Sequence, residues 1–251
     1  MKYTEEFIQI INDWQAFGLR ERKIELYNKL KSFDISPKLR ICNQYCYRIT
    51  DFRVKIPTLS MMSAGISEQI HIGVSSWTLE KQIAKDFYKK HSPLTPSEGQ
   101  NYIIKIYPEP QQIVINLNSL YNDKNFLEKC EQYKSRIQNY EKGIGYWKNN
   151  QKEVILDIDT VSVDDICAFW GYSSTPEEFY KKYGNIINSI IQTVEENRRE
   201  SFANRVYEFL NQQLGAFWLE DEESVKNKIT FLKSEAKKLD KLRKLYPMYF
   251  Y

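Results

Sequence analysis

The sequence is poor in the side chains that hold metal ions. It has two histidines, and its four cysteines form no Cys-x-x-Cys pair; they are Cys42, Cys46, Cys130 and Cys167. Zinc sites need three or four such ligands, usually at short spacings, so the sequence predicts no metal site. Cysteines placed singly in this way are expected to be buried, reduced thiols.

Long apolar segments are lacking as well. No run of 18 or more apolar residues occurs, so we expect no membrane span and no membrane partner. The first residues, Met1 to Glu6, lack the basic and apolar regions of a signal peptide, which predicts a cytoplasmic protein. The net charge of +3 is too small to indicate nucleic-acid binding by itself.

The composition is that of a folded protein. The chain has 251 residues, of which 42% are hydrophobic and 27% charged. This length suits one large domain, or one domain with an appendage. Periodicity divides it into an N-terminal helical segment at 1–39, a core of mixed structure at 40–172 and a C-terminal helical region at 173–251.

The core is expected to be mainly strands, because β-branched runs recur in it between turn residues. The expected strands are 44–50, 70–76, 101–107, 112–117, 152–159 and 164–170. Helical spacing predicts helices over 5–31, over 78–90 with Thr78 as its cap, and within a polar insertion at 119–142. The fold class is therefore α+β.

The C-terminal region carries a basic helix. From Ser224 to Lys244 the chain has eight Lys and Arg residues against Glu235 and Asp240. Such a run fits a solvated helix face, and it also fits a surface for RNA, DNA or an acidic partner. The aromatic end, 246–251, is expected to pack on the protein or to dock a partner.

Three short motifs follow one another in the core. Arg48 lies in an aromatic strand, Ser76-Trp77-Thr78 ends a strand before a helix, and Gln151-Lys152-Glu153 precedes the apolar run from Val154. Each also has a structural interpretation: an arginine paired with a nearby carboxylate, a capping hydroxyl and a polar strand start.

In this order the motifs resemble the mono-ADP-ribosyltransferase superfamily, in the branch with an Arg-Ser-Glu triad. The resemblance covers residues 40–172 and implies a split β-sheet core, with the helical segments as additions. It implies an NAD-dependent enzyme that breaks the bond between nicotinamide and ribose and transfers ADP-ribose, with NAD as substrate. The transition state resembles the oxocarbenium ion of glycoside hydrolysis.

The resemblance also implies roles for individual residues. Arg48 would bind the pyrophosphate, and Ser76 would bind a ribose or orient the glutamate. Glu153 would stabilise the positive charge at the ribose. The further residues implied to contact NAD are Tyr47, Trp77, Thr78 and Phe87.

The acceptor would be addressed by residues just before Glu153. Gln151 is expected to share a strand face with Glu153, since side chains alternate along a strand. A glutamine cannot deprotonate a guanidinium, which disfavours an arginine acceptor. Tyr146 and Trp147 are expected to contact the acceptor by stacking on a base or by clamping a protein side chain.

Four functions remain open at this point. The leading one is an intracellular toxin that modifies nucleic acid, with an RNA base favoured. The others are transfer to a protein amide or thiol, hydrolysis of NAD, and a non-enzymatic interaction module. Toxins of this kind also suggest a neutralising antitoxin protein as partner.

Overall fold

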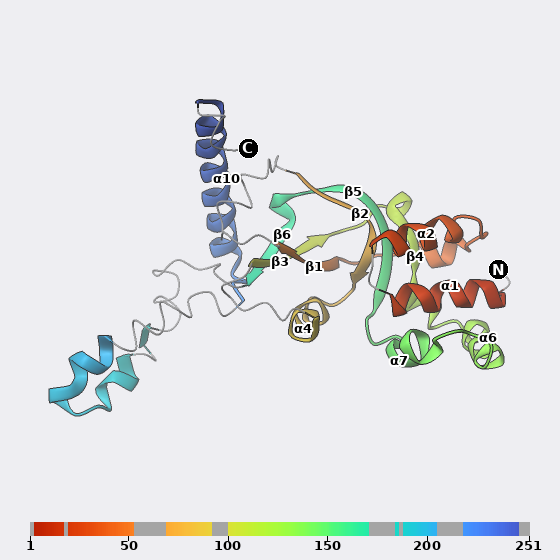
Figure 1. Cartoon of the computed structure of the whole chain (residues 1–251), viewed down its shortest axis with the longest axis horizontal. Helices are drawn as coiled ribbons and strands as arrows, with labels where there is room; N and C mark the ends of the chain where they lie inside the picture. The colour runs from red at the N-terminus through yellow and green to blue at the C-terminus, as the bar shows by residue number, and fades with distance from the viewer. Residues whose placement is uncertain are drawn as a thin grey trace. The chain divides into compact units, whose positions relative to one another are not determined.

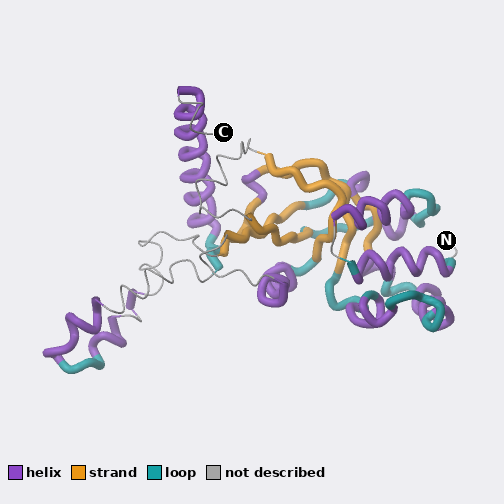
Figure 2. Tube along the Cα trace, viewed as in Figure 1, coloured by secondary structure: helices purple, strands orange, loops and turns teal. Residues whose placement is uncertain are grey.

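The protein is an α+β structure built on a six-stranded sheet (Figure 1, Figure 2). The computed structural model describes residues 3–17, 20–52, 69–91, 100–170, 184–185, 188–204 and 218–245. Contacts divide the chain into two compact units. Unit 1 comprises 1–48, 71–86 and 105–161, and unit 2 comprises 49–70, 87–104 and 162–251.

All six strands expected from the sequence are present, with ends that differ by at most three residues. They are β1 (Cys46–Phe52), β2 (Gln69–Thr78), β3 (Gln100–Ile106), β4 (Ile113–Asn116), β5 (Glu153–Ser162) and β6 (Ile166–Trp170). Their order in the sheet is β4-β5-β2-β1-β3-β6. The β1–β2, β4–β5 and β3–β6 pairs are antiparallel. This confirms the α+β class, whereas the ADP-ribosyltransferase fold stays a prediction.

Two helices form the N-terminal part of unit 1. They are α1 (Glu5–Ala16) and α2 (Arg20–Leu30). The Thr4 side chain accepts a hydrogen bond from the backbone N–H of Phe7 (3.2 Å) and so caps α1. Phe7, Ile11 and Trp14 are at most 1% exposed and belong to the same apolar cluster as Ile115 and Ile155 of the sheet. The first helix is therefore an integral part of the core of this unit.

Within the insertion predicted at 119–142, α6 (Lys124–Tyr133) is helical as expected. A short helix, α5 (Leu117–Leu120), overlaps its start, and another, α7 (Ile144–Trp147), follows its end. Both α6 and α7 contact α1 (Figure 1). At α7 the approach is close, because a Cβ on Gly143 would lie 2.3 Å from the carbonyl oxygen of Asn12. The Asn12 side chain also accepts the backbone N–H of Ile144 (2.9 Å), so Asn12 holds α7 against α1.

Unit 2 carries the basic helix α10 (Glu222–Leu245), which contacts β6. Val225 and Ile229 are buried. Some of its lysines form ion pairs within the protein: Lys233 pairs with Asp164 (2.8 Å) and Lys226 with Glu222 (2.7 Å). The aromatic end at 246–251, and residues 173–183, 186–187 and 205–217 of the expected helical region, lie outside the described residues.

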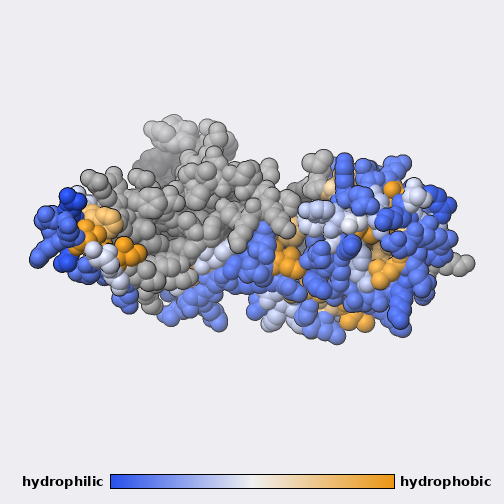
Figure 3. Space-filling view, turned by 90° about the horizontal axis from the view of Figure 1, so that it is seen from below, coloured by the Kyte–Doolittle hydropathy of each residue, from blue (hydrophilic) through white to orange (hydrophobic). Residues whose placement is uncertain are grey.

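No helix among the described residues combines the length and apolar character needed to cross a membrane. On the face seen in Figure 3, the described surface is mainly hydrophilic, and hydrophobic residues appear in small separate areas. Scattered apolar residues of this kind are normal on protein surfaces and indicate no particular partner.

Candidate functional site

The three motifs that are far apart in the sequence meet in unit 1. Arg48 lies on β1, Ser76 on β2 and Glu153 is the first residue of β5. Arg48 Nη1 donates a hydrogen bond to the backbone carbonyl of Ser76 (2.7 Å). The strand order places β5, β2 and β1 side by side, so the three predicted residues come from adjacent strands.

The first helix links the serine to the glutamate. Trp14 Nε1 lies 2.9 Å from Glu153 Oε1 and 3.1 Å from Ser76 Oγ, so one indole N–H is shared between the two oxygens. Gln15 Nε2 donates to the other carboxylate oxygen of Glu153 (3.4 Å) and is held by Tyr121, whose hydroxyl donates to Gln15 Oε1 (2.7 Å). Glu153 is only 4% exposed. The carboxylate is thus covered by α1, and its charge is stabilised by directed donors.

A second cation enters from α2. Lys23 Nζ donates to Ser76 Oγ (2.7 Å) and lies 4.8 Å from the centre of the Trp14 ring. Burial lowers the pKa of Lys23 because the charged ammonium loses hydration; the positive charge of Arg48 acts in the same direction and Glu153 opposes it. Lys23 thus contacts the Ser76 hydroxyl directly, Glu153 shares the Trp14 N–H with that hydroxyl, and Arg48 binds the backbone carbonyl of Ser76.

The low pKa of Lys23 predicts a pH-dependent stability. The folded protein releases this proton at a lower pH than the unfolded chain, whose lysine titrates near 10.5. Between these two values the unfolded chain binds more protons, so raising the pH stabilises the folded state. We expect the melting temperature of the wild type, relative to that of Lys23→Met, to rise as the pH increases towards 10.5.

Thermal unfolding of the two proteins over this pH range measures the effect. Lys29→Met is the matched control, since Lys29 lies on the same helix with a side chain that is 50% exposed. The melting temperature of the wild type minus that of Lys23→Met is the quantity that matters. If it does not change with pH, or falls as the pH rises, the burial of the Lys23 ammonium is contradicted.

Gln151 lies in a different place from the one expected. It is in the turn before β5, and Lys152 has a φ of 46°, in the left-handed region. The regular alternation of side chains therefore does not extend from Glu153 back to Gln151, and the prediction of one shared strand face is wrong. The turn is held instead through its backbone: Thr78 Oγ1 donates to the Gln151 carbonyl (2.7 Å), and Leu79 N donates to that of Lys152 (3.0 Å).

The other predicted NAD contacts are distributed around this cluster. Tyr47 is half-buried and pairs with Thr78 across β1 and β2. Thr78 is buried, and its hydroxyl accepts a hydrogen bond from the backbone N–H of Glu80 (3.3 Å). The helix expected over 78–90 is α4 (Lys81–His91), which begins three residues later. Trp77 is only 2% exposed and its indole donates to Ser75 Oγ (3.1 Å).

Trp77 alternates with Ser76 along β2, so its side chain packs on the other face of the strand. Its burial fits packing beneath the site, and its contact with NAD stays a prediction. Phe87 lies in α4, half-buried and in unit 2, and its contact with NAD stays a prediction.

The predicted acceptor residues form an exposed aromatic pair. Tyr146 is 63% exposed and Trp147 is half-buried on α7. Their rings are 4.8 Å apart and perpendicular. Since only five residues separate the end of α7 from the start of β5, this pair lies on the segment that leads directly to Glu153.

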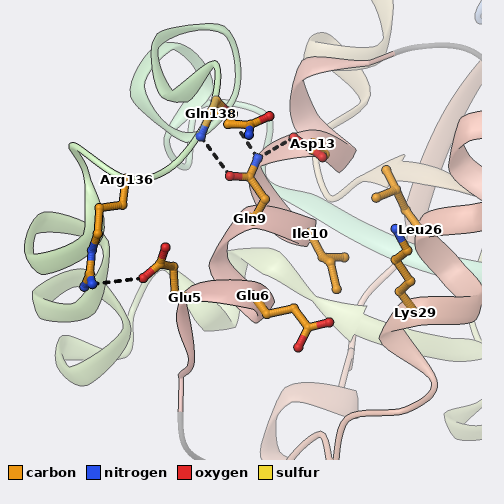
Figure 4. A pocket seen from close by; sticks show the side chains of 9 residues that line it. All are labelled: Glu5, Glu6, Gln9, Ile10, Asp13, Leu26, Lys29, Arg136 and Gln138. Carbon is orange, nitrogen blue, oxygen red and sulfur yellow. Dashed lines mark hydrogen bonds and ion pairs between the residues drawn. The ribbon is translucent and has the colours of Figure 1, made fainter.

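A separate surface pocket lies between α1, α2 and residues 136–138, with a volume of about 500 Å³ (Figure 4). It is lined by Glu5, Glu6, Gln9, Ile10, Asp13, Leu26, Lys29, Arg136 and Gln138. Two of its charged residues, Arg136 and Glu5, pair with each other (3.2 Å). It contains none of the triad residues. In the part of the chain that the structure describes, no three His, Cys, Asp or Glu side chains gather as a metal site.

Sequence reasoning missed the helical half of the cluster. Trp14, Gln15 and Lys23 form this half, and no motif of the sequence points to them. Comparison of the chain with protein-family models, with curated proteins and with solved structures finds no match. The function is therefore inferred from the side chains of this chain alone.

Proposed function

We propose that the protein is an NAD-dependent mono-ADP-ribosyltransferase that modifies a nucleic acid, with an RNA base as acceptor. The observation that carries the proposal is the convergence of Arg48, Ser76 and Glu153 from three adjacent strands. An arginine, a hydroxyl and a carboxylate are the groups that this reaction needs, and they are distant in the sequence.

The donor set fits NAD. The guanidinium of Arg48 and the ammonium of Lys23 are two cations suited to a diphosphate, and the arginine can bind two phosphate oxygens at once. The Ser76 hydroxyl is suited to a ribose hydroxyl. The Glu153 carboxylate would accept the 2′-hydroxyl of the nicotinamide ribose and stabilise the cation that forms as nicotinamide leaves.

The burial of Glu153 sets a condition on this function. Its oxygens are bound by Trp14 and Gln15, so a ribose hydroxyl must displace at least one of these donors. The exchange replaces one hydrogen bond to the carboxylate by another, which makes its net cost small. NAD binding is therefore expected to be coupled to a movement of the Trp14 indole.

The same burial favours a second candidate. A carboxylate that is 4% exposed and bonded to two helical side chains also suits a non-catalytic role, in which the cluster joins α1 to the sheet. Release of nicotinamide from NAD by the purified protein separates the two. Nicotinamide release above the spontaneous rate supports the enzymatic function. No nicotinamide release over many hours supports the structural role. Free ADP-ribose without a labelled macromolecule would identify a hydrolase.

The acceptor part of the proposal depends on Tyr146. An exposed aromatic ring can stack on a nucleic-acid base, an interaction worth about 1–3 kcal/mol. We expect Tyr146→Ala to reduce transfer of ADP-ribose to RNA about tenfold, while nicotinamide release stays within about twofold, because the ring touches the acceptor rather than NAD.

Tyr107→Ala is the matched control, since Tyr107 is 56% exposed and lies outside this segment. Both activities are measured with the same NAD preparation. An equal loss of transfer and nicotinamide release in Tyr146→Ala would contradict the acceptor role of the ring.

A further inference from the structure

Two of the cysteines that the sequence presents as isolated are neighbours in the structure. Cys42 and Cys46 are 7% and 0% exposed, and their sulfur atoms lie 3.6 Å apart. Both are free thiols joined by a hydrogen bond. A disulfide requires sulfur atoms about 2.05 Å apart, so side-chain rotation and a small backbone adjustment must bring them together.

The surroundings hold this pair in place. The backbone carbonyl of Ile41, next to Cys42, accepts a hydrogen bond from Asn116 Nδ2 (2.8 Å). Tyr45, next to Cys46, packs edge-on against Tyr107 and lies 4.0 Å from the Lys105 ammonium. The segment between the two cysteines is thus anchored at both ends, which keeps the sulfur atoms together.

We propose that Cys42 and Cys46 form a site of reversible oxidation, at which a peroxide converts the two thiols to an intramolecular disulfide. The sulfur of Cys42 attacks one oxygen of the peroxide; the O–O bond breaks, and a sulfenic acid and water form. The sulfur of Cys46 then attacks the sulfur of Cys42. The S–S bond forms as the S–O bond breaks, and the departing hydroxide takes the Cys46 proton as water. Two electrons pass from the thiols to the peroxide.

The electrostatics of the pair agree with this order. The hydrogen bond from the Cys46 thiol lowers the pKa of Cys42, and that bond together with burial raises the pKa of Cys46. Cys42 therefore supplies the reactive thiolate and Cys46 resolves the intermediate. Cys130 offers a contrast, since burial raises its pKa to about 12.

The site lies beside the proposed catalytic cluster. Cys46 begins β1, and Arg48 follows on the same strand face two residues later. Pulling the Cys46 sulfur towards Cys42 changes the start of this strand, and with it the position from which Arg48 reaches the Ser76 carbonyl. Oxidation is therefore expected to lower the NAD turnover of the protein, a consequence that rests on the proposed function.

Mass spectrometry tests the proposal directly. The full chain, as wild type and as the Cys130→Ser, Cys167→Ser double variant, is treated with hydrogen peroxide and then with iodoacetamide. We expect the peptide with Cys42 and Cys46 to lose two hydrogen atoms, to resist alkylation, and to regain both thiols with dithiothreitol. Cys42→Ser and Cys46→Ser should not show this loss. Two alkylated thiols after peroxide treatment of the folded chain, or irreversible sulfinic acid in place of the disulfide, would overturn the proposal.

Nicotinamide release by the same samples measures the consequence. The link to Arg48 is supported if oxidation lowers nicotinamide release by the wild type and dithiothreitol restores it. In Cys42→Ser, oxidation should leave nicotinamide release unchanged. Unchanged release with a disulfide present overturns that link. The mass measurement does not depend on activity, so a failure of the proposed function is distinguishable from a failure of the disulfide.

Discussion

Glu153→Gln is expected to reduce NAD turnover at least about 100-fold, a loss typical of removing one group that stabilises transition-state charge. The amide has the size of the carboxylate, and its oxygen can still accept the Trp14 N–H. It lacks the negative charge that would stabilise the oxocarbenium ion. The expected result is therefore a loss of activity with a similar melting temperature.

The choice of glutamine matters because of the burial of Glu153. An alanine would leave the Trp14 indole and the Gln15 amide without their acceptor, at a cost of about 1–3 kcal/mol for each buried donor. An alanine at this position is therefore expected to weaken the fold. Any loss of activity in that variant would mix catalysis with stability.

Asp159→Asn is the matched control for Glu153→Gln. Asp159 lies on the same strand, is exposed, and undergoes the same chemical change. Rates of nicotinamide release and melting temperatures of the three proteins are compared. Unchanged turnover in Glu153→Gln would remove Glu153 from the mechanism, and a large fall in melting temperature would indicate that its main role is structural.

Phe7→Ala is expected to destabilise the protein by about 3–5 kcal/mol, the usual cost of removing a buried phenylalanine side chain. Phe7 is 0% exposed and packs 5.5 Å from Phe33 and 5.8 Å from Tyr3, measured between ring centres. Its loss leaves a cavity between α1 and the rest of the core that these rings cannot fill.

The free energy of unfolding, measured with a chemical denaturant, gives the size of this effect. Leu127→Ala is the control, because Leu127 is helical and 43% exposed, and we expect a loss below about 1 kcal/mol. A small effect of Phe7→Ala would mean that the packing of α1 contributes little to the stability of the core. A large one supports α1 as part of the core, so that Trp14 and Gln15 are fixed beside Glu153.

The strands could be predicted from the sequence because their signal is local. Runs such as Ile103-Ile104 and Val154-Ile155-Leu156 favour strands wherever they occur, and all of these residues are 0% exposed in the sheet. Arg48, Ser76 and Glu153 could be singled out for another reason. The order of their motifs along the chain resembles a known arrangement, and the structure places the three residues on adjacent strands.

The contribution of the helices could not be predicted, because periodicity reveals a buried face but not what it covers. Trp14 fits the apolar stripe of α1, yet its N–H bonds two residues that lie more than sixty positions away. Gln151 was misplaced since nothing in the sequence indicates the positive φ of Lys152, a residue that rarely adopts it. Likewise, the contact between Cys42 and Cys46 depends on how the chain turns into β1.

Labelled NAD tests the central claim most directly. The full chain is incubated with NAD labelled in its adenine and a cell lysate, and aliquots are then treated with RNase, DNase or protease. We predict label on a macromolecule that only RNase removes, and no such label with Glu153→Gln. The contradicting result is that folded wild-type protein leaves NAD intact and no macromolecule carries label. Arg48, Ser76 and Glu153 would then not form an ADP-ribosyl transfer site.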